Sequence, residues 1–176
     1  MCTPYEKLIL DSYVEGVFAT DKLIEVIEDN SQILECEIYR GIFVPNFVLK
    51  IGNDINKYHP TKIMSFSKNI KIAKRFSQKS FIDEYVFNYL KRDGYNVNHY
   101  YKPNDNSFFS RVIIRLKDYK CFDLYAHYEN KAYEHEKEVL VITEPLYIQA
   151  ITEENDMTIV DCVNEAEFAK NFMISV

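Results

Sequence analysis

Glycine is scarce and widely spaced in this chain, which limits the folds in which it could bind a nucleotide. The sequence has 176 residues but only four glycines, and no two of them lie closer than eleven positions apart. A Walker-type phosphate loop and a G-x-G-x-x-G dinucleotide fingerprint both need clustered glycines. The chain has neither motif, so any bound phosphate must be held by side chains and single backbone amides.

The N-terminal part of the sequence predicts helices. Thr3 and Glu6 can form a capping box around Pro4, a residue that is favourable at the first position of a helix. Thr20 is expected to be the N-cap of a second, short helix. Together these helices make residues 1–34 an N-terminal helical segment.

The rest of the sequence favours strands, interrupted by helices. Apolar residues at helical spacing indicate helices over 69–78 and 81–93, and Asn164 is expected to cap a short closing helix. Residues 95–110 are rich in Asn and Tyr and are expected to form a long loop. Helices followed mostly by strands, without alternating β and α elements, predict an α+β fold. Strands are expected at 35–40, 42–51, 61–67, 111–116, 138–142, 146–151 and 157–163.

Length and composition indicate one globular domain spanning residues 1–176. The chain is 47% hydrophobic and 27% charged, which is ordinary for a globular protein. No stretch approaches the roughly 18 apolar residues of a membrane span, and the start of the chain lacks the pattern of a signal peptide. The four cysteines form no C-x-x-C pair. We therefore expect a monomeric cytoplasmic protein with reduced thiols and no membrane partner.

Charge is unevenly distributed along the sequence. Residues 1–40 hold nine acidic and three basic side chains, residues 41–120 hold six and fifteen, and residues 121–176 hold twelve and three. One explanation is that these blocks interleave in the fold, so that their charges pair. The alternative is that residues 41–120 form a basic surface that binds a nucleotide, a nucleic acid or an acidic protein.

Arg40 is the first of three features whose chemistry suits a functional site. The alternation of the expected strand places Arg40 on the same inward-looking face as Cys36 and Ile38. Its guanidinium could bind a phosphate or a carboxylate through two hydrogen bonds. Gly41, which has no Cβ, would let a ligand approach the backbone closely. The alternative is an arginine at a strand end that pairs with a structural carboxylate.

The second feature is the segment SFSKNIKIAKRF at residues 65–76. Ser65 and Ser67 alternate at the end of an expected strand, so both hydroxyls face the same side. A helix follows directly, and its unpaired N–H groups and positive end point back towards the serines. This arrangement suits a polar ligand or a buried carboxylate. A serine N-cap followed by a solvated basic helix face would explain the same residues.

The third feature is the segment YEHEKEVLV at residues 133–141. In an extended chain Glu136 and Glu138 project from one face, with their backbones roughly 6.5–7 Å apart. Carboxylates this close repel each other, and such pairs often serve acid–base chemistry or stabilise a cation. The alternative is a charged edge strand that discourages aggregation. No metal site is expected, because the segment around His135 lacks both the second histidine of a zincin and the P-C-x-x-C of zinc deaminases.

In this order and spacing, the three features resemble the arginine-specific mono-ADP-ribosyltransferases, including small members carried by tailed phages. IYRG, which contains Tyr39, resembles the family's aromatic-Arg-Gly strand. SFSKNIKIAKRF resembles its Ser-Thr-Ser strand and following helix, with Phe66 in place of the central threonine, and EKEVLV resembles its E-x-E motif. The resemblance covers residues 36–148 and leaves 1–35 unmatched. It implies an ADP-ribosyltransferase-like fold with two packed, mostly antiparallel β-sheets and with N-terminal and flanking helices.

The resemblance also implies an activity: NAD serves as co-substrate, and its ADP-ribose moves to an accessible arginine of an intracellular protein. Glu138 would hold the nicotinamide ribose and stabilise the cation that forms as nicotinamide leaves, and Ser65 would orient Glu138. Glu136 would bind the acceptor guanidinium and take its proton. The residues implied to contact NAD are Tyr39, Arg40, Gly41, Ser65, Ser67 and Phe76.

Some assignments stay open at the level of sequence. The aromatic ring that would accompany the nicotinamide could be Tyr85, Phe87, Tyr100 or Tyr101. Water could replace arginine as the acceptor, which would make the protein an NAD glycohydrolase. The basic segment 41–120 would also suit ADP-ribosylation of a nucleic acid, or a non-catalytic binding module.

Overall fold

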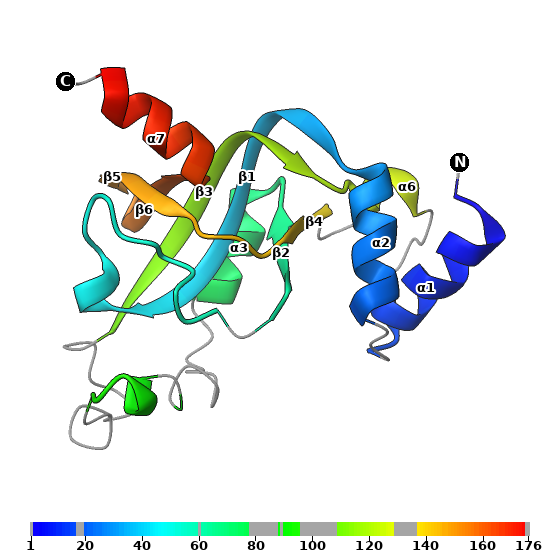
Figure 1. Cartoon of the computed structure of the whole chain (residues 1–176), viewed down its shortest axis with the longest axis horizontal. Helices are drawn as coiled ribbons and strands as arrows, with labels where there is room; N and C mark the ends of the chain where they lie inside the picture. Colours follow the sequence, from blue (N-terminus) through cyan, green and yellow to red (C-terminus); the bar gives the residue numbers. More distant parts are fainter. Residues whose placement is uncertain are drawn as a thin grey trace.

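The described part of the chain forms one mixed β-sheet with helices packed around it, as the computed structural model shows (Figure 1). The structure describes residues 2–16, 20–59, 61–77, 88, 90–95, 109–128 and 137–174. The predicted α+β class is confirmed. In chain order the elements are α1 (Pro4–Val14), α2 (Thr20–Asn30), β1 (Gln32–Pro45), the short 3₁₀ helix η1 (Asn46–Val48), β2 (Ile63–Ser67), α3 (Ile70–Ser77), β3 (Phe109–Cys121), α6 (Leu124–His127), β4 (Glu138–Ile142), β5 (Tyr147–Glu154), β6 (Met157–Val163) and α7 (Glu165–Ile174).

The strands of the described residues join into a single six-stranded sheet in the order β4-β2-β1-β3-β6-β5. Every neighbouring pair is antiparallel except β3 and β6, which are parallel. The prediction of two packed sheets is therefore wrong. The reason is that β1 and β3 are 14 and 13 residues long and pair along almost their whole length. The β1–β3 pair lies at the centre of the sheet. Strands β2 and β4 are joined to it through β1, and strands β6 and β5 are joined to it through β3.

The structure of β1 differs from the prediction both in its bounds and in which residues face inward. The ranges 35–40 and 42–51, predicted as separate strands, merge into β1, which ends at Pro45. The pairing of β1 with β3 shifts register between Leu34 and Glu37, as at a β-bulge. Because of this shift Cys36 is exposed, whereas Ile38 is 1% exposed and lies in the core. Cys36 therefore does not share the buried face, as simple alternation had suggested.

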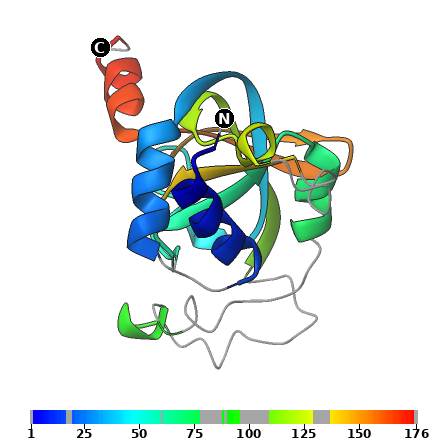
Figure 2. The same cartoon turned by 90° about the vertical axis from the view of Figure 1, so that its right-hand side faces the viewer.

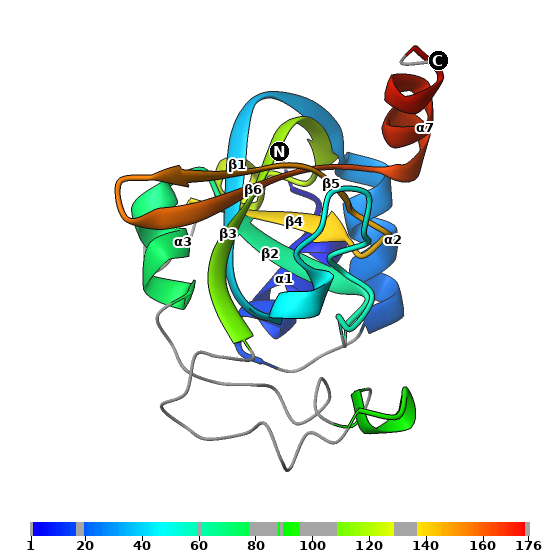
Figure 3. The same ribbon diagram turned by 90° about the vertical axis from the view of Figure 1, so that its left-hand side faces the viewer.

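Three apolar clusters hold the helices on the sheet. The largest cluster includes Ile38 and Ile114 and covers one face of the central strands. On the other face, Ala73 of α3 packs with residues of β3 and β6. The helices α1 and α2 pack around Leu140 of β4. Figure 2 shows α1 and α2 in front of the sheet, and Figure 3 shows that α2 and α3 lie on opposite sides of it.

Most of the remaining elements lie where local sequence patterns predict them. Helix α3 and the strands β4 and β6 match the predicted ranges closely. Of the predicted helix 81–93 only a part is described, but residues 90–92 are helical and Gly94 has the left-handed φ of 87° that ends helices. The four-residue helix α6, which Asp123 caps, was not predicted. None of the helices in the described ranges is long and apolar enough to cross a membrane.

Helix α1 begins with the predicted capping box. The backbone N–H of Glu6 donates to Thr3 Oγ1 at 3.2 Å, and the backbone N–H of Thr3 donates to Glu6 Oε2 at 2.7 Å. Asn30, at the end of α2, donates its side-chain N–H to Glu6 Oε1 at 2.9 Å. The cap therefore fixes both the start of α1 and its contact with α2.

Replacing Thr3 by alanine is expected to lower the free energy of unfolding by about 1 kcal/mol, because it removes the side-chain acceptor of the cap. Urea denaturation followed by circular dichroism measures this change. The control is Thr3→Ser, which keeps the hydroxyl and should stay close to wild type. Equal stability of the alanine variant and wild type would show that the cap contributes nothing.

Candidate active site

Residues from all three sequence motifs line one pocket. Its volume is about 210 Å³, and its walls come from β1, β2, α3 and the first residue of β4. Glu136 and the four aromatic candidates for the nicotinamide loop lie outside the described residues. The lining residues are Tyr39, Arg40, Gly41, Ser65, Phe66, Ser67, Ile72, Ala73, Phe76 and Glu138.

The pairing of strands places three of these residues in one row. Ser67 of β2 lies opposite Tyr39 of β1 on one side and opposite Glu138 of β4 on the other. Residues directly opposite one another in neighbouring strands project from the same face. Ser67 and Glu138 are only 5% and 8% exposed, so the carboxylate lies in a largely desolvated position.

Arg40 lies where β1 and β2 separate. The two strands are in register only at Tyr39 and Ser67, and the guanidinium of Arg40 bridges the gap beyond this pair. Its Nη1 donates to the backbone carbonyl of Ser65 at 2.7 Å, and its Nη2 donates to Nε2 of His59 at 3.1 Å. Among the described residues, Arg40 therefore bonds to a carbonyl and an imidazole, and the structural carboxylate considered from the sequence is not found there.

One donor of Arg40 has no partner in the described part of the chain. Its Nε is fully buried and makes no hydrogen bond there. Burial lowers the pKa of Arg40 to about 10, against the opposing effects of Tyr13 and Glu138, and the side chain stays charged at neutral pH. A buried donor without an acceptor costs free energy, so this N–H is a suitable contact for an anionic ligand.

Gly41 lines the pocket and lies directly under the backbone of α3. A Cβ built on Gly41 would lie 1.9 Å from the backbone oxygen of Ala73 and 2.5 Å from the backbone nitrogen of Ser77. The backbone of α3 therefore passes directly over this position of β1. The close approach that the structure shows is that of α3. The approach of a ligand to Gly41, suggested by the sequence, stays a prediction.

The serine segment combines the two interpretations made from the sequence. The backbone N–H of Asn69 donates to Ser67 Oγ at 3.0 Å, so Ser67 helps to form the turn that starts α3. Both serines also line the pocket, and the backbone of Ser65 accepts the bond from Arg40. Phe76, at the other end of α3, lines the same pocket and is 44% exposed. Its ring is thus accessible to a bound molecule.

Glu138 has a hydrogen-bond partner that the sequence did not indicate. The hydroxyl of Tyr13, on α1, donates to Glu138 Oε1 at 2.8 Å. From the resemblance we had expected Ser65 to orient this carboxylate. Tyr13 belongs to the segment that matched no motif, and the contact joins residues 125 positions apart, so no local pattern could have indicated it.

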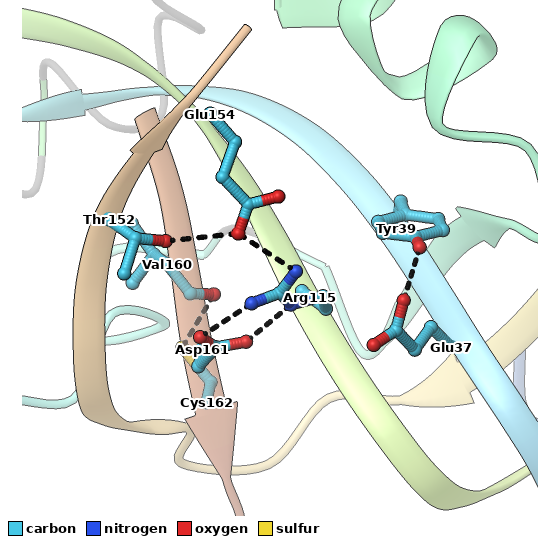
Figure 4. A network of polar contacts seen from close by, with 8 residues as sticks. All are labelled: Glu37, Tyr39, Arg115, Thr152, Glu154, Val160, Asp161 and Cys162. Atoms are coloured by element: carbon cyan, nitrogen blue, oxygen red, sulfur yellow. Dashed lines mark hydrogen bonds and ion pairs between the residues drawn. The ribbon is translucent and has the colours of Figure 1, made fainter. Parts of the chain in front are cut away.

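Ion pairs between distant segments neutralise part of the basic block. Lys68 pairs with Asp123. Arg115 pairs with Asp161 at 2.6 Å and with Glu154 at 3.3 Å (Figure 4). The hydrogen bond with Asp161 raises the pKa of Arg115. These contacts support the interleaving of charge blocks for the residues concerned.

Tyr39 connects the pocket to this polar face of the sheet. It lies opposite Arg115 in the β1–β3 pairing, and its hydroxyl donates to Glu37 Oε2 at 2.5 Å (Figure 4). Burial and this bond raise the pKa of Tyr39 to about 12, so its hydroxyl stays protonated at neutral pH. Within the described residues, no group of three or more His, Cys, Asp or Glu side chains is placed to hold a metal ion.

Comparison with known proteins identifies the fold. No protein-family model and no curated protein matches the sequence. The structure of ADP-ribosyltransferase Vis in complex with the M6 inhibitor matches with a TM-score of 0.51 and 18% identity, over 94% of this chain and 76% of that one. This likeness shows that the chain has the fold of an ADP-ribosyltransferase, as the sequence motifs predicted.

Two further structures of the same protein match less well. Vis in complex with agmatine has a TM-score of 0.46 and 19% identity, and covers 89% of this chain and 64% of that one. Vis toxin, an ADP-ribosyltransferase from Vibrio splendidus, has a TM-score of 0.45 and 20% identity, and covers 89% and 63%. This chain therefore spans slightly less than two thirds of the length of these two structures.

Proposed function

We propose that the protein is an ADP-ribosyltransferase that transfers ADP-ribose from NAD to arginine side chains of a protein. The observation that carries this proposal is the pocket in which Arg40, Ser65 and Glu138 meet, in a chain with the fold of an ADP-ribosyltransferase. These residues come from three strands that are far apart in the sequence. Their convergence on one pocket is what such an enzyme requires.

The residues of the pocket fit the chemistry of NAD. The pyrophosphate of NAD is anionic, and the buried Nε of Arg40 lacks an acceptor within the described ranges. The half-exposed ring of Phe76 offers an apolar surface for a planar ring. We assign Arg40 to the phosphates or the adjoining ribose, and Phe76 to the vicinity of the nicotinamide.

Glu138 has the main catalytic role in this proposal. The bond between the nicotinamide nitrogen and ribose C1′ breaks, and its electrons leave with nicotinamide, which becomes neutral. Positive charge then develops on the ribose, as in glycoside hydrolysis. A fixed carboxylate that is 8% exposed stabilises this charge more than a solvated one would, because its surroundings screen it less.

We assign the choice of acceptor to Glu136, which remains a prediction from the sequence. A guanidinium is protonated in water and is a poor nucleophile. A carboxylate two residues before Glu138 would hold it near ribose C1′. As the new C–N bond forms, the proton released from the guanidinium passes to this carboxylate.

The direct test uses NAD labelled in its adenylate part, together with an arginine-rich protein and a version of it with lysine in place of arginine. We expect label on the arginine version only, with release of nicotinamide. Nicotinamide release without labelled protein would show NAD hydrolysis instead. With a cell lysate as the acceptor, label that a nuclease removes would show modification of nucleic acid. Failure to consume NAD would overturn the proposal.

Replacing Glu136 by glutamine is expected to lower arginine labelling by about 100-fold or more, because the acceptor loses its base. Slow nicotinamide release to water should continue, since Glu138 is unchanged. Both products can be measured in one reaction, by scintillation counting and by chromatography. Glu134→Gln, the same change outside the E-x-E motif, is the control. Equal loss of both products in Glu136→Gln would contradict a role confined to the acceptor.

A further inference from the structure

The N-terminal helix α1 contacts the candidate active site through the side chain of Tyr13. The hydroxyl of Tyr13 donates to Glu138 Oε1 at 2.8 Å, and the Tyr13 ring packs against the apolar cluster between α1, α2 and β4. Tyr13 does not belong to any of the three sequence motifs. It nevertheless makes a direct hydrogen bond to the carboxylate at the centre of the proposed chemistry.

A hydrogen bond and a shared apolar cluster relate α1 to β4. Leu10 and Tyr13 are three positions apart, so they lie on one face of the helix with a rise of about 4.5 Å between them. Glu138 and Leu140 are two positions apart, so they project from one face of β4 about 6.6 Å apart. Leu10 and Leu140 are both 0% exposed and belong to one apolar cluster, while Tyr13 bonds to Glu138. Burial of this cluster therefore holds α1 on the side of the sheet where the Tyr13 hydroxyl reaches Glu138.

A second tyrosine anchors the same helix. The hydroxyl of Tyr128 donates to Asp11 Oδ1, two residues before Tyr13. This contact lies on α1 as well, but it does not involve Glu138. The structure thus contains two tyrosine–carboxylate bonds on one helix, of which one is at the pocket.

We propose that Tyr13 is a positioning residue for Glu138. Its hydroxyl fixes one carboxylate oxygen and stabilises the ionised form by hydrogen bonding. A lysine or arginine at this position would also donate, but its charge would cancel the negative charge that the proposed reaction needs. A neutral donor orients the carboxylate and leaves its charge intact. The catalytic part of this inference rests on the proposed function.

The test is Tyr13→Phe, which removes only the hydroxyl, with Tyr128→Phe as the matched control. The first measurement is a titration of the Glu138 carboxyl carbon by ¹³C NMR, assigned by the signal that Glu138→Gln lacks. A hydrogen bond to the ionised form lowers a pKa, so losing the bond from Tyr13 should raise the pKa of Glu138 in Tyr13→Phe. Tyr128→Phe should leave this pKa unchanged.

The second measurement is the steady-state rate of nicotinamide release. Tyr13→Phe should lower kcat by about 10-fold, with little change in KM for NAD, and should move the acidic limb of the pH profile to higher pH. In a Glu138→Gln background, Tyr13→Phe should have no further effect, because its action passes through the carboxylate. Tyr13→Leu, which also lacks the hydroxyl, provides the same comparison if the phenylalanine variant does not fold.

The outcomes separate this inference from the proposed function. If wild type consumes no NAD, the proposed function fails, and the titration alone decides the role of Tyr13. If the pKa of Glu138 is the same in wild type and Tyr13→Phe, the positioning role is overturned. The same holds if Tyr128→Phe changes this pKa as much as Tyr13→Phe does, because the effect would then come from the anchoring of α1.

Discussion

Replacing Glu138 by glutamine is expected to slow nicotinamide release and arginine labelling by about 10²–10³-fold. The two side chains have nearly the same shape, and the amide oxygen can still accept the bond from Tyr13. The pairing of Glu138 with Ser67 uses the backbone and does not depend on the charge. The substitution thus removes the negative charge while preserving the pocket, and that charge is what would stabilise the cation on the ribose.

Initial rates of nicotinamide release at saturating NAD measure this effect. Glu144→Gln, the same change just beyond the end of β4, is the control and should retain the wild-type rate. Thermal melting of both variants shows whether the fold is kept. A rate for Glu138→Gln within about threefold of wild type would contradict the proposed role of the carboxylate.

Replacing Gly41 by alanine is expected to have the largest effect on stability. The added Cβ would lie 1.9 Å from the Ala73 oxygen and 2.5 Å from the Ser77 nitrogen, and both are backbone atoms that cannot rotate away. Helix α3 would have to move away from β1. Overpacking of this kind costs about 3 kcal/mol, at the upper end of the usual range. For a chain of this size the melting temperature should fall by about 6–12 °C.

Differential scanning calorimetry tests this prediction. The control is Ile33→Ala on the same strand, where the side chain is 65% exposed and the change should cost less than about 0.5 kcal/mol. The double variant Gly41→Ala/Ala73→Gly should be no more stable than Gly41→Ala, because the clash is with the backbone of residue 73. Wild-type stability of Gly41→Ala would show that α3 packs differently on β1.

Features that depend on neighbouring residues could be predicted from the sequence. The capping box of α1 involves residues three positions apart, and the start of α3 is marked by the adjacent Ser67 and Asn69. The same is true of the motif residues Arg40 and Glu138, each of which lies in a short segment with a recognisable pattern. The resemblance to known enzymes then indicated that these segments belong to one site, and the described ones do line one pocket.

Features that depend on distant contacts were missed or misassigned. The number of sheets depends on the pairing of β1 with β3 along almost their whole length, and neither strand's own sequence specifies this partner. The exposure of Cys36 results from a register shift against β3, which simple alternation does not include. The sequence suggested a ligand beside Gly41 but gave no sign that the backbone of α3 also packs on it, because that contact depends on how α3 lies on β1.

The connection between Tyr13 and Glu138 also affects how the protein is made. Strand β2 pairs with β4, and Tyr13 bonds to a residue 125 positions later, so the pocket depends on contacts that are remote along the chain. Contacts between residues far apart in the sequence are slow to form, because closing the long loop between them costs entropy. A nascent chain still on the ribosome, before β4 has been translated, contains Arg40 and both serines but lacks the carboxylate. On the proposed mechanism, a nascent chain that does not yet include β4 cannot consume NAD.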